Sequence, residues 1–283
     1  MSIESAGRTA GRDEPHHWFV ERDDGGAWSA HGALLRLLNG NSARPGSGGV
    51  PLQHLTRGAV LLHEGAPARC VYVIQAGDFK CVKTAEDGYE LVLDFAGRGD
   101  LLGFDAVASG HHPSGAVALE DAAVFAIPLH ELEAMRRGGH AFDAALQATV
   151  SRQLERLGEA AWSMSAVGAD VRVARFLVQL SARMLERGQS PRLLRLRMGR
   201  RDIASHLGLA HESISRSFGS LVEMGLLRVD NRDVEIIDIA RLQQHARCTR
   251  GLGEEGAHRP AALPAGHHRT GPDRRASPMA AAA

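Results

Sequence analysis

The spacing of apolar residues changes along the chain and divides it into parts with different periods. Between residues 50 and 130, short apolar runs such as AVLLHEG, CVYVIQAGDFKCVKT and AVALEDAAVFAIPL alternate with turn residues. Runs of this length, punctuated at intervals of about 8 to 12 positions, are typical of a small antiparallel barrel or jelly roll. We therefore expect a β-roll over residues 50–130.

The pattern becomes helical between residues 131 and 168. An apolar stripe recurs there at alternating steps of four and three, and its members are Val150, Leu154, Leu157, Ala161 and Met164. The neighbouring positions are polar, so the stripe is narrow, which is typical of a seam between two helices. The alternative is a helix that packs only on its own β-roll. We predict a long dimerisation helix over 131–168, paired with a second copy of the chain.

Residues 169–246 show a third arrangement. The segment ADVRVARFLVQLSARMLERG predicts an amphipathic helix that ends at Gly188, followed by a short strand in LLRLRMG. Two further helices follow, RRDIASHLGL closed by Gly208 and AHESISRSFGSLVEMG closed by Gly225, and then two strands around a polar turn. This order predicts a winged helix-turn-helix, so the fold class is α+β.

Both ends of the chain have the composition of flexible segments. Residues 1–49 read as a flexible leader with one short helix at ALLRLL, and residues 247–283 as a disordered tail. We expect the tail's His267 and His268 to be solvated rather than bound to a metal. No apolar run approaches a membrane span, and the N-terminus lacks the apolar core of a signal peptide. We therefore expect a cytoplasmic protein without a membrane partner.

Charge is unevenly distributed although the net charge is zero. Residues 171–247 hold 14 Arg against 8 Asp or Glu, whereas residues 31–130 hold 7 basic against 10 acidic side chains. A basic segment on an otherwise acidic chain is expected of a module that binds double-stranded DNA.

The second helix of the predicted helix-turn-helix has side chains suited to reading bases. Helical spacing predicts a buried face made of Ile203, Ala204, Leu207, Ile214, Phe218 and Leu221. The opposite face then carries Arg216, which can pair with guanine, and Glu212, which can accept from the cytosine amino group. Because phosphates repel a carboxylate, Glu212 favours sequence reading over backbone binding; the alternative is an ordinary surface ion pair. We expect DNA contacts from Arg201, His211, Glu212, Ser213, Ser215 and Arg216.

Two stretches resemble the Fnr branch of the Crp/Fnr superfamily of bacterial transcription regulators. They are GDLLGFDAVASGHHPSGAVALED (99–121) and RRDIASHLGLAHESISRSFGSLVEMGLL (200–227), the latter with an E-x-x-S-R core. The resemblance implies a cyclic-nucleotide-binding-type β-roll, a homodimer, contact with RNA polymerase, and a palindromic site with TTGAT-like halves. It also implies an activator of microaerobic, anaerobic or nitrogen-oxide respiration genes. His211 departs from the small apolar residue expected at its position.

Three departures from better-understood members bear on the signal. An iron–sulfur cluster needs four thiolates, but no cysteine precedes Cys70 and the β-roll position holds Phe125. Members that bind cyclic AMP hold its phosphate with an Arg–Ser pair, where this chain has Pro113 and Ser114. Iron–sulfur members place an acidic residue where Leu157 stands. We therefore expect no cofactor and a dimer that forms without one.

The sequence is also compatible with two other classes of function. A runner-up is a ligand-gated regulator whose β-roll holds an unidentified small molecule or haem. Another is a metal-dependent jelly-roll enzyme that uses His63, His111 and His112; these lack the His-x-His alternation of strand-borne metal sites, so we expect no enzyme activity. Cys81 is a candidate redox switch if its thiol is exposed.

Overall fold

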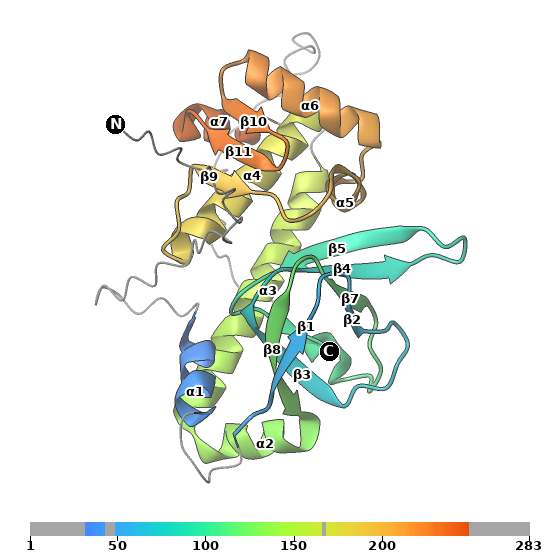
Figure 1. Cartoon of the computed structure of the whole chain (residues 1–283), viewed down its shortest axis with the longest axis vertical. Coiled ribbons are helices and arrows are strands. Elements are labelled where there is room, and N and C mark those ends of the chain that lie inside the picture. The colour runs from blue at the N-terminus through green and yellow to red at the C-terminus, as the bar shows by residue number, and fades with distance from the viewer. Residues whose placement is uncertain (1–31, 43–48, 166–167, 249–283) are drawn as a thin grey trace, which may run out of the picture. The chain divides into compact units, whose positions relative to one another are not determined.

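The computed structural model describes residues 32–42, 49–165 and 168–248. One helix comes first, a β-rich part and further helices follow, and a helix-turn-helix with a small sheet comes last (Figure 1). The predicted α+β fold is confirmed. Most of the expected leader and nearly all of the expected tail, with His267 and His268, lie outside the described residues.

The β-rich part is a roll of two four-stranded antiparallel sheets, in the orders β1-β8-β3-β6 and β2-β7-β4-β5. The elements are β1 (Leu52–Leu55), β2 (Val60–Leu62), β3 (Cys70–Ala76), β4 (Phe79–Thr84), β5 (Glu90–Ala96), β6 (Leu101–Leu102), a short 3-10 turn (Phe104–Ala106), β7 (Gly115–Ala118) and β8 (Ala122–Pro128). The buried side chains of Ile74, Phe79, Leu102 and Val124 form a core with residues of both sheets. Strand β5 lies at the edge of its sheet.

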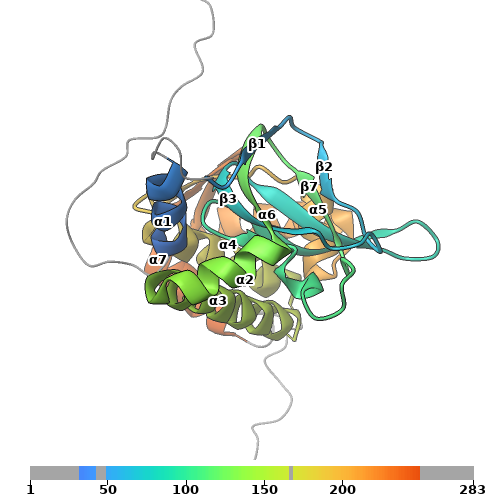
Figure 2. The same ribbon diagram turned by 90° about the horizontal axis from the view of Figure 1, so that it is seen from below.

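Three helices gather on one side of the roll (Figure 2). They are α1 (Ala33–Ser42), α2 (Leu129–Gly138) and α3 (His140–Met164). Alternate positions of β3, Val71 and Val73, are buried in one cluster with side chains of these helices, such as Leu34 and Leu146. This is the period-two alternation that places one set of side chains on each face of a strand.

The stretch expected to hold one long helix holds two. Gly139 is in an extended conformation, with φ −160° and ψ 115°, so α2 ends there and α3 begins at His140. Two consecutive glycines, Gly138 and Gly139, disfavour a continuous helix because glycine loses the most backbone freedom when it is ordered. The long helix is therefore α3, with 25 residues.

The C-terminal part is a winged helix-turn-helix. Its elements are α4 (Ala169–Glu186), β9 (Leu193–Arg195), α5 (Arg200–Leu207), α6 (His211–Glu223), β10 (Leu227–Asp230), β11 (Asp233–Ile236) and α7 (Ile239–Arg247). The three strands form one antiparallel sheet in the order β10-β11-β9. Helix α7 packs on α4, and His245 Nε2 lies 2.9 Å from Asp170 Oδ2. Within the described ranges, every helix is too short or too polar to span a membrane.

Candidate nucleic-acid interface

The turn between α5 and α6 is set by one glycine and several backbone bonds. Gly208 has φ +62°, a left-handed conformation that glycine adopts without steric cost. The amide of Leu209 then donates to Ala204 O at 2.9 Å, and the Arg172 guanidinium donates to Leu207 O at 3.0 Å. These bonds occupy carbonyls at the C-terminal end of α5 and so fix where α6 begins.

Helix α6 has one buried and one exposed face, as its spacing predicts. Ile203, Ala204 and Leu207 of α5 and Ile214, Phe218 and Leu221 of α6 are all buried in one cluster. The predicted buried face is confirmed. Because six apolar side chains hold the two helices in one core, the opposite face of α6 is presented by a rigid support.

The residues expected to contact DNA lie on the exposed side. His211, Glu212, Ser215 and Arg216 are exposed, and Ser213 is half-buried. Arg216 Nη2 lies 3.4 Å from Ser213 Oγ, which is a weak contact that a base edge can replace. Arg201 is exposed near the start of α5. The first two turns of α6 thus combine a guanidinium donor, hydroxyl groups that donate and accept, and one carboxylate acceptor.

Arg200 is a structural residue of this surface that the sequence reasoning missed. Its guanidinium lies 3.6 Å from the centroid of the Phe218 ring and donates to Asn231 O at 3.2 Å. Arg200 thereby ties the start of α5 to α6 and to the turn of the wing. The helical spacing of the sequence indicates this role, because Arg200 precedes Ile203 and Leu207 by three and seven positions and so lies on the same buried face of α5.

The wing adds basic side chains beside α6. Strands β10 and β11 pair Val229 with Val234 and are joined through Asn231, whose φ of +51° is tolerated by asparagine. Arg228 pairs with Glu235 across the strands, and Arg232 donates to the Arg197 carbonyl at 3.0 Å. Arg228 is exposed and Arg232 is half-buried, and arginines on a wing are typical of phosphate contacts.

Helix α5 is also bonded to the edge strand of the roll. The Ser205 hydroxyl accepts from the Val92 amide at 3.0 Å and donates to Glu90 O at 2.9 Å. Lys80 Nζ lies 3.2 Å from Asp202 Oδ1, while the other oxygen of Asp202 accepts from the Gly199 amide at the start of α5. Helix α5, which supports α6, is therefore attached to the roll by hydrogen bonds between the Ser205 hydroxyl and the backbone of β5, and by the Lys80–Asp202 ion pair.

An aromatic cluster fills the space behind these bonds. The His206 ring packs edge-on against Phe95 at 5.1 Å and Phe176 at 5.9 Å between centroids. Burial lowers the pKa of His206, because the cationic ring loses hydration in this apolar setting. The neutral imidazole is thus the form that fits the folded protein.

The stripe expected to form a dimer seam lies on α3. Leu154 is 64% exposed, Leu157 52% and Met164 41%, and Ala161 is exposed as well. Val150 differs, because it is half-buried against the cluster of α1, α2, α3 and the roll. The stripe therefore packs on its own chain at Val150 and is exposed from Leu154 onward.

The roll does not fit a cyclic nucleotide. Its interior is filled by side chains such as Phe79 and Ile74, both fully buried. At the place of the family's phosphate-binding pair, Pro113 is exposed and Ser114 half-buried, and neither carries a positive charge. The Phe125 side chain, at the position of an iron–sulfur cysteine, is 2% exposed in the apolar cluster.

The candidate histidines and thiols are not assembled into a site. Among the described residues, no three His, Cys, Asp or Glu side chains are placed to hold a metal ion. His63 and His111 are exposed, whereas His112 is 5% exposed. Burial, and next the charge of Asp94, raise the pKa of the Cys81 thiol, which opposes the thiolate that a redox switch needs.

Two family models match this chain in the order in which its parts occur. The model described as "Cyclic nucleotide-binding domain" matches residues 52–138, and the "Crp-like helix-turn-helix domain" matches residues 171–245. The first covers the roll with α2, and the second covers α4 through α7 up to its last turn.

Relatives and solved structures agree with these matches. The fumarate and nitrate reduction regulatory proteins of Escherichia coli K12 and Shigella dysenteriae are each 35% identical over 198 residues, which is 70% of this chain and 79% of theirs. FixK2 from Bradyrhizobium japonicum has the same fold, with a TM-score of 0.63, 24% identity and coverage of 70% of this chain and 98% of FixK2. A CooA mutant from Carboxydothermus hydrogenoformans has a TM-score of 0.62 at 22% identity, covering 75% and 95%. With a roll, a winged helix-turn-helix and these relatives, the chain belongs to the Crp/Fnr family of transcription regulators and, like its members, is a regulator with a DNA-binding domain rather than an enzyme.

Proposed function

We propose that this protein is a homodimer that binds a palindromic DNA site through two copies of α6. The observation that carries this proposal is the division of α6 into a buried face, with Ile214 and Phe218, and an exposed face, with Glu212, Ser215 and Arg216. A helix held in this way can enter the major groove and present its polar side chains to base edges.

The preferred site is a pair of inverted TTGAT-like half-sites. Arg216 is suited to a guanine, because its guanidinium can donate two bonds to one base edge. Glu212 is suited to the amino group of a cytosine on either strand. Ser215, between them in the chain, can bond to a base or a phosphate. The exposed turns of α3 bring the two copies together, and no cofactor is needed for this.

The regulated genes are those of microaerobic, anaerobic or nitrogen-oxide respiration, where the protein acts as an activator that contacts RNA polymerase through the roll. This part of the proposal is supported by the 35% identity to fumarate and nitrate reduction regulatory proteins.

The test is a selection of DNA sequences from a random pool, with the purified protein in air and without added cofactor. We expect inverted TTGAT-like half-sites separated by a short spacer. Recovery of random sequences would contradict the proposal.

A pair of variants then separates base reading from phosphate contact. Arg216→Ala is expected to cost about 1–3 kcal/mol at its own base pair and to relax specificity there. The matched control is Arg201→Ala, a change of the same size on the neighbouring helix. It should weaken all sequences alike and lower the salt dependence of binding by about one ion. If Arg216→Ala behaves like Arg201→Ala, α6 does not read that base through Arg216.

A further inference from the structure

A buried arginine joins the N-terminal half of α4 to the last turn of α3. Arg175 of α4 is 2% exposed, and its Nη1 donates to Trp162 O at 2.9 Å. The central carbon of the same guanidinium lies 3.5 Å from the centroid of the Trp162 ring. The last carbonyls of a helix carry partial negative charge and can accept from side chains, so a buried guanidinium stabilises this end of α3.

The other nitrogens of Arg175 bind the end of α7. Nε donates to Ala246 O at 2.8 Å, and Nη2 donates to Cys248 O at 3.1 Å. One planar group on α4 therefore binds the C-terminal ends of two other helices, α3 and α7. Arg175→Lys would keep the positive charge but present a single nitrogen, which cannot reproduce donors arranged in a fixed plane.

A second bond between α4 and α3 lies one turn further along α4. Gln179 Nε2 donates to Ser163 Oγ at 3.2 Å, and Ser163 is 2% exposed. Because Arg175 and Gln179 are four positions apart, they lie on the same face of α4. We call these four residues, Arg175 and Gln179 of α4 with Trp162 and Ser163 of α3, the clamp.

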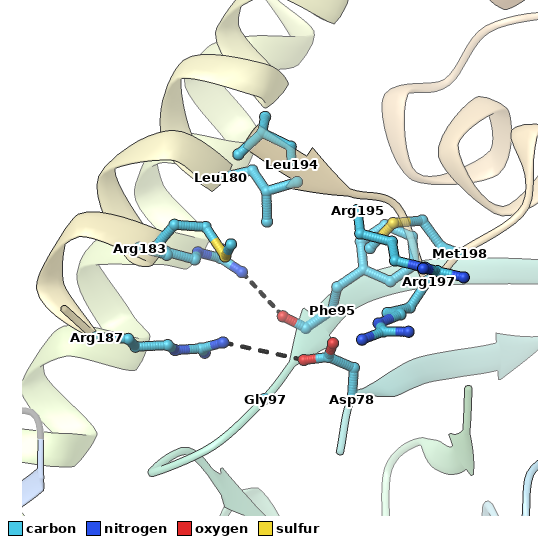
Figure 3. A pocket seen from close by; sticks show the side chains of 11 residues that line it. Asp78, Phe95, Gly97, Leu180, Arg183, Arg187, Leu194, Arg195, Arg197 and Met198 are labelled. Atoms are coloured by element: carbon cyan, nitrogen blue, oxygen red, sulfur yellow. Dashed lines mark hydrogen bonds and ion pairs between the residues drawn. The ribbon is translucent and has the colours of Figure 1, made fainter. Parts of the chain in front are cut away.

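The other end of α4 is attached to the roll. Arg183 Nη1 donates to Phe95 O at 2.9 Å (Figure 3). Arg187 Nη2 lies 3.6 Å from Asp100 Oδ2, and Arg156 Nη1 of α3 lies 2.6 Å from the other oxygen of Asp100. The roll, α3 and α4 are therefore attached in pairs, and the clamp attaches α3 to α4. Three bodies joined in pairs hold one arrangement, whereas the loss of one attachment leaves them free to rotate.

The clamp controls the direction in which α4 leaves α3. Helix α4 has 18 residues and is therefore roughly 27 Å long. A rotation of about 10° at the clamp moves the far end of α4 by about 5 Å, which exceeds the roughly 3.4 Å of one base-pair step. Phe176 and Leu177 of α4 share one buried core with Ile214 and Phe218 of α6. Because this core is closely packed, α6 moves with α4.

We propose that Arg175 is a positioning residue that sets the distance between the two half-sites that the protein binds. Through the clamp it fixes the direction of α4 on α3, the helix that pairs with its own copy in the proposed homodimer. The inference rests on that proposed function and deepens it, because it assigns the spacer length to a buried residue outside both α6 and the stripe on α3. Two binding surfaces that are joined rigidly bind tightly only to sites at the matching separation, whereas a loosely joined pair accepts several separations.

The test measures binding of the full-length protein to DNA that carries inverted TTGAT half-sites, separated by a series of spacers that increase by one base pair. DNA with a single half-site reports on the exposed face of α6 alone. We expect the unmodified protein to prefer one spacer over both of its neighbours by at least about tenfold in Kd. Arg175→Lys should reduce this preference to about threefold or less and leave binding to the single half-site within about twofold.

A loss of folded protein cannot imitate this result, because it lowers binding to every spacer by the same factor and leaves the preference unchanged. Gln179→Ala removes only the second bond of the clamp and should reduce the preference by a smaller factor; it replaces Arg175→Lys in the test if circular dichroism shows that Arg175→Lys does not fold. The matched control is Arg247→Lys, the same substitution at an exposed side chain of α7, which should keep the preference of the unmodified protein.

Two further outcomes are distinguishable. If the unmodified protein binds all spacers alike, the proposed function is wrong and this inference fails with it. If the unmodified protein prefers one spacer and the clamp variants prefer it equally, the proposed function stands and the role of Arg175 is overturned.

Discussion

The exposed stripe on α3 gives a quantitative prediction for the dimer. Leu154 and Leu157 are 64% and 52% exposed in a single chain. Complete burial of a leucine side chain stabilises by about 2 kcal/mol, so burial of the remaining surface contributes about 1 kcal/mol for each side chain. The double variant L154A/L157A removes both side chains from both protomers. It should weaken dimerisation by roughly 4 kcal/mol, which is about a thousandfold in Kd.

Sedimentation equilibrium over a dilution series measures this Kd directly. The control is Leu185→Ala, because Leu185 is 62% exposed on α4, outside the stripe. It should leave the Kd unchanged, and circular dichroism should show that both variants keep their helices. If L154A/L157A dissociates at the same concentration as the unmodified protein, the stripe on α3 is not the seam and the burial argument fails.

Three further predictions concern the contacts that support α6. Ser205→Ala leaves the Val92 amide without its partner and should lower the free energy of unfolding by about 1–3 kcal/mol in urea titrations. An unchanged free energy of unfolding would show that this hydrogen bond does not stabilise the fold. Because burial lowers the pKa of His206 below 6.5, the unfolded chain binds more protons just below that pH. The free energy of unfolding should therefore rise with pH up to about 6.5 and then level off. The His206→Phe variant should lack the contribution of His206 to this rise. If both proteins show the same dependence on pH, His206 is not its source. Arg200→Leu removes a cation–π contact with Phe218 and should lower stability by about 1–2 kcal/mol, whereas the neighbouring Arg201→Leu should not.

Local patterns in the sequence predicted most of the fold and the exposed face of α6. The helical spacing of Ile203, Leu207, Ile214 and Phe218 identified the buried side, and all four are buried in one core. This succeeded because each helix buries one stripe and the turn at Gly208 needs a residue that tolerates positive φ. The break at Gly139 was missed, because the prediction rested on the apolar stripe that begins at Val150 and did not consider the consecutive glycines Gly138 and Gly139.

Contacts between distant segments could not be predicted in this way. Ser205 and Val92 are 113 positions apart, and nothing in either neighbourhood indicates the other. Val150 was assigned to the seam with Leu154, but periodicity cannot distinguish an apolar residue that faces a partner from one that packs on its own domain. Arg187 of α4 and Asp78 are likewise far apart in the sequence, and only the folded chain brings them together.

The bonds of Ser205 have a consequence for exchanging domains between regulators. Both are made to main-chain atoms of β5, the Val92 amide and the Glu90 carbonyl, so they do not depend on which side chains that strand carries. A winged helix moved onto the roll of another regulator would keep them wherever an equivalent edge strand is free. The Lys80 to Asp202 ion pair needs matching residues on both sides and would be lost. Chimaeras should therefore retain the attachment of α5 while losing the charge pairing that matches one roll to its own DNA-binding domain.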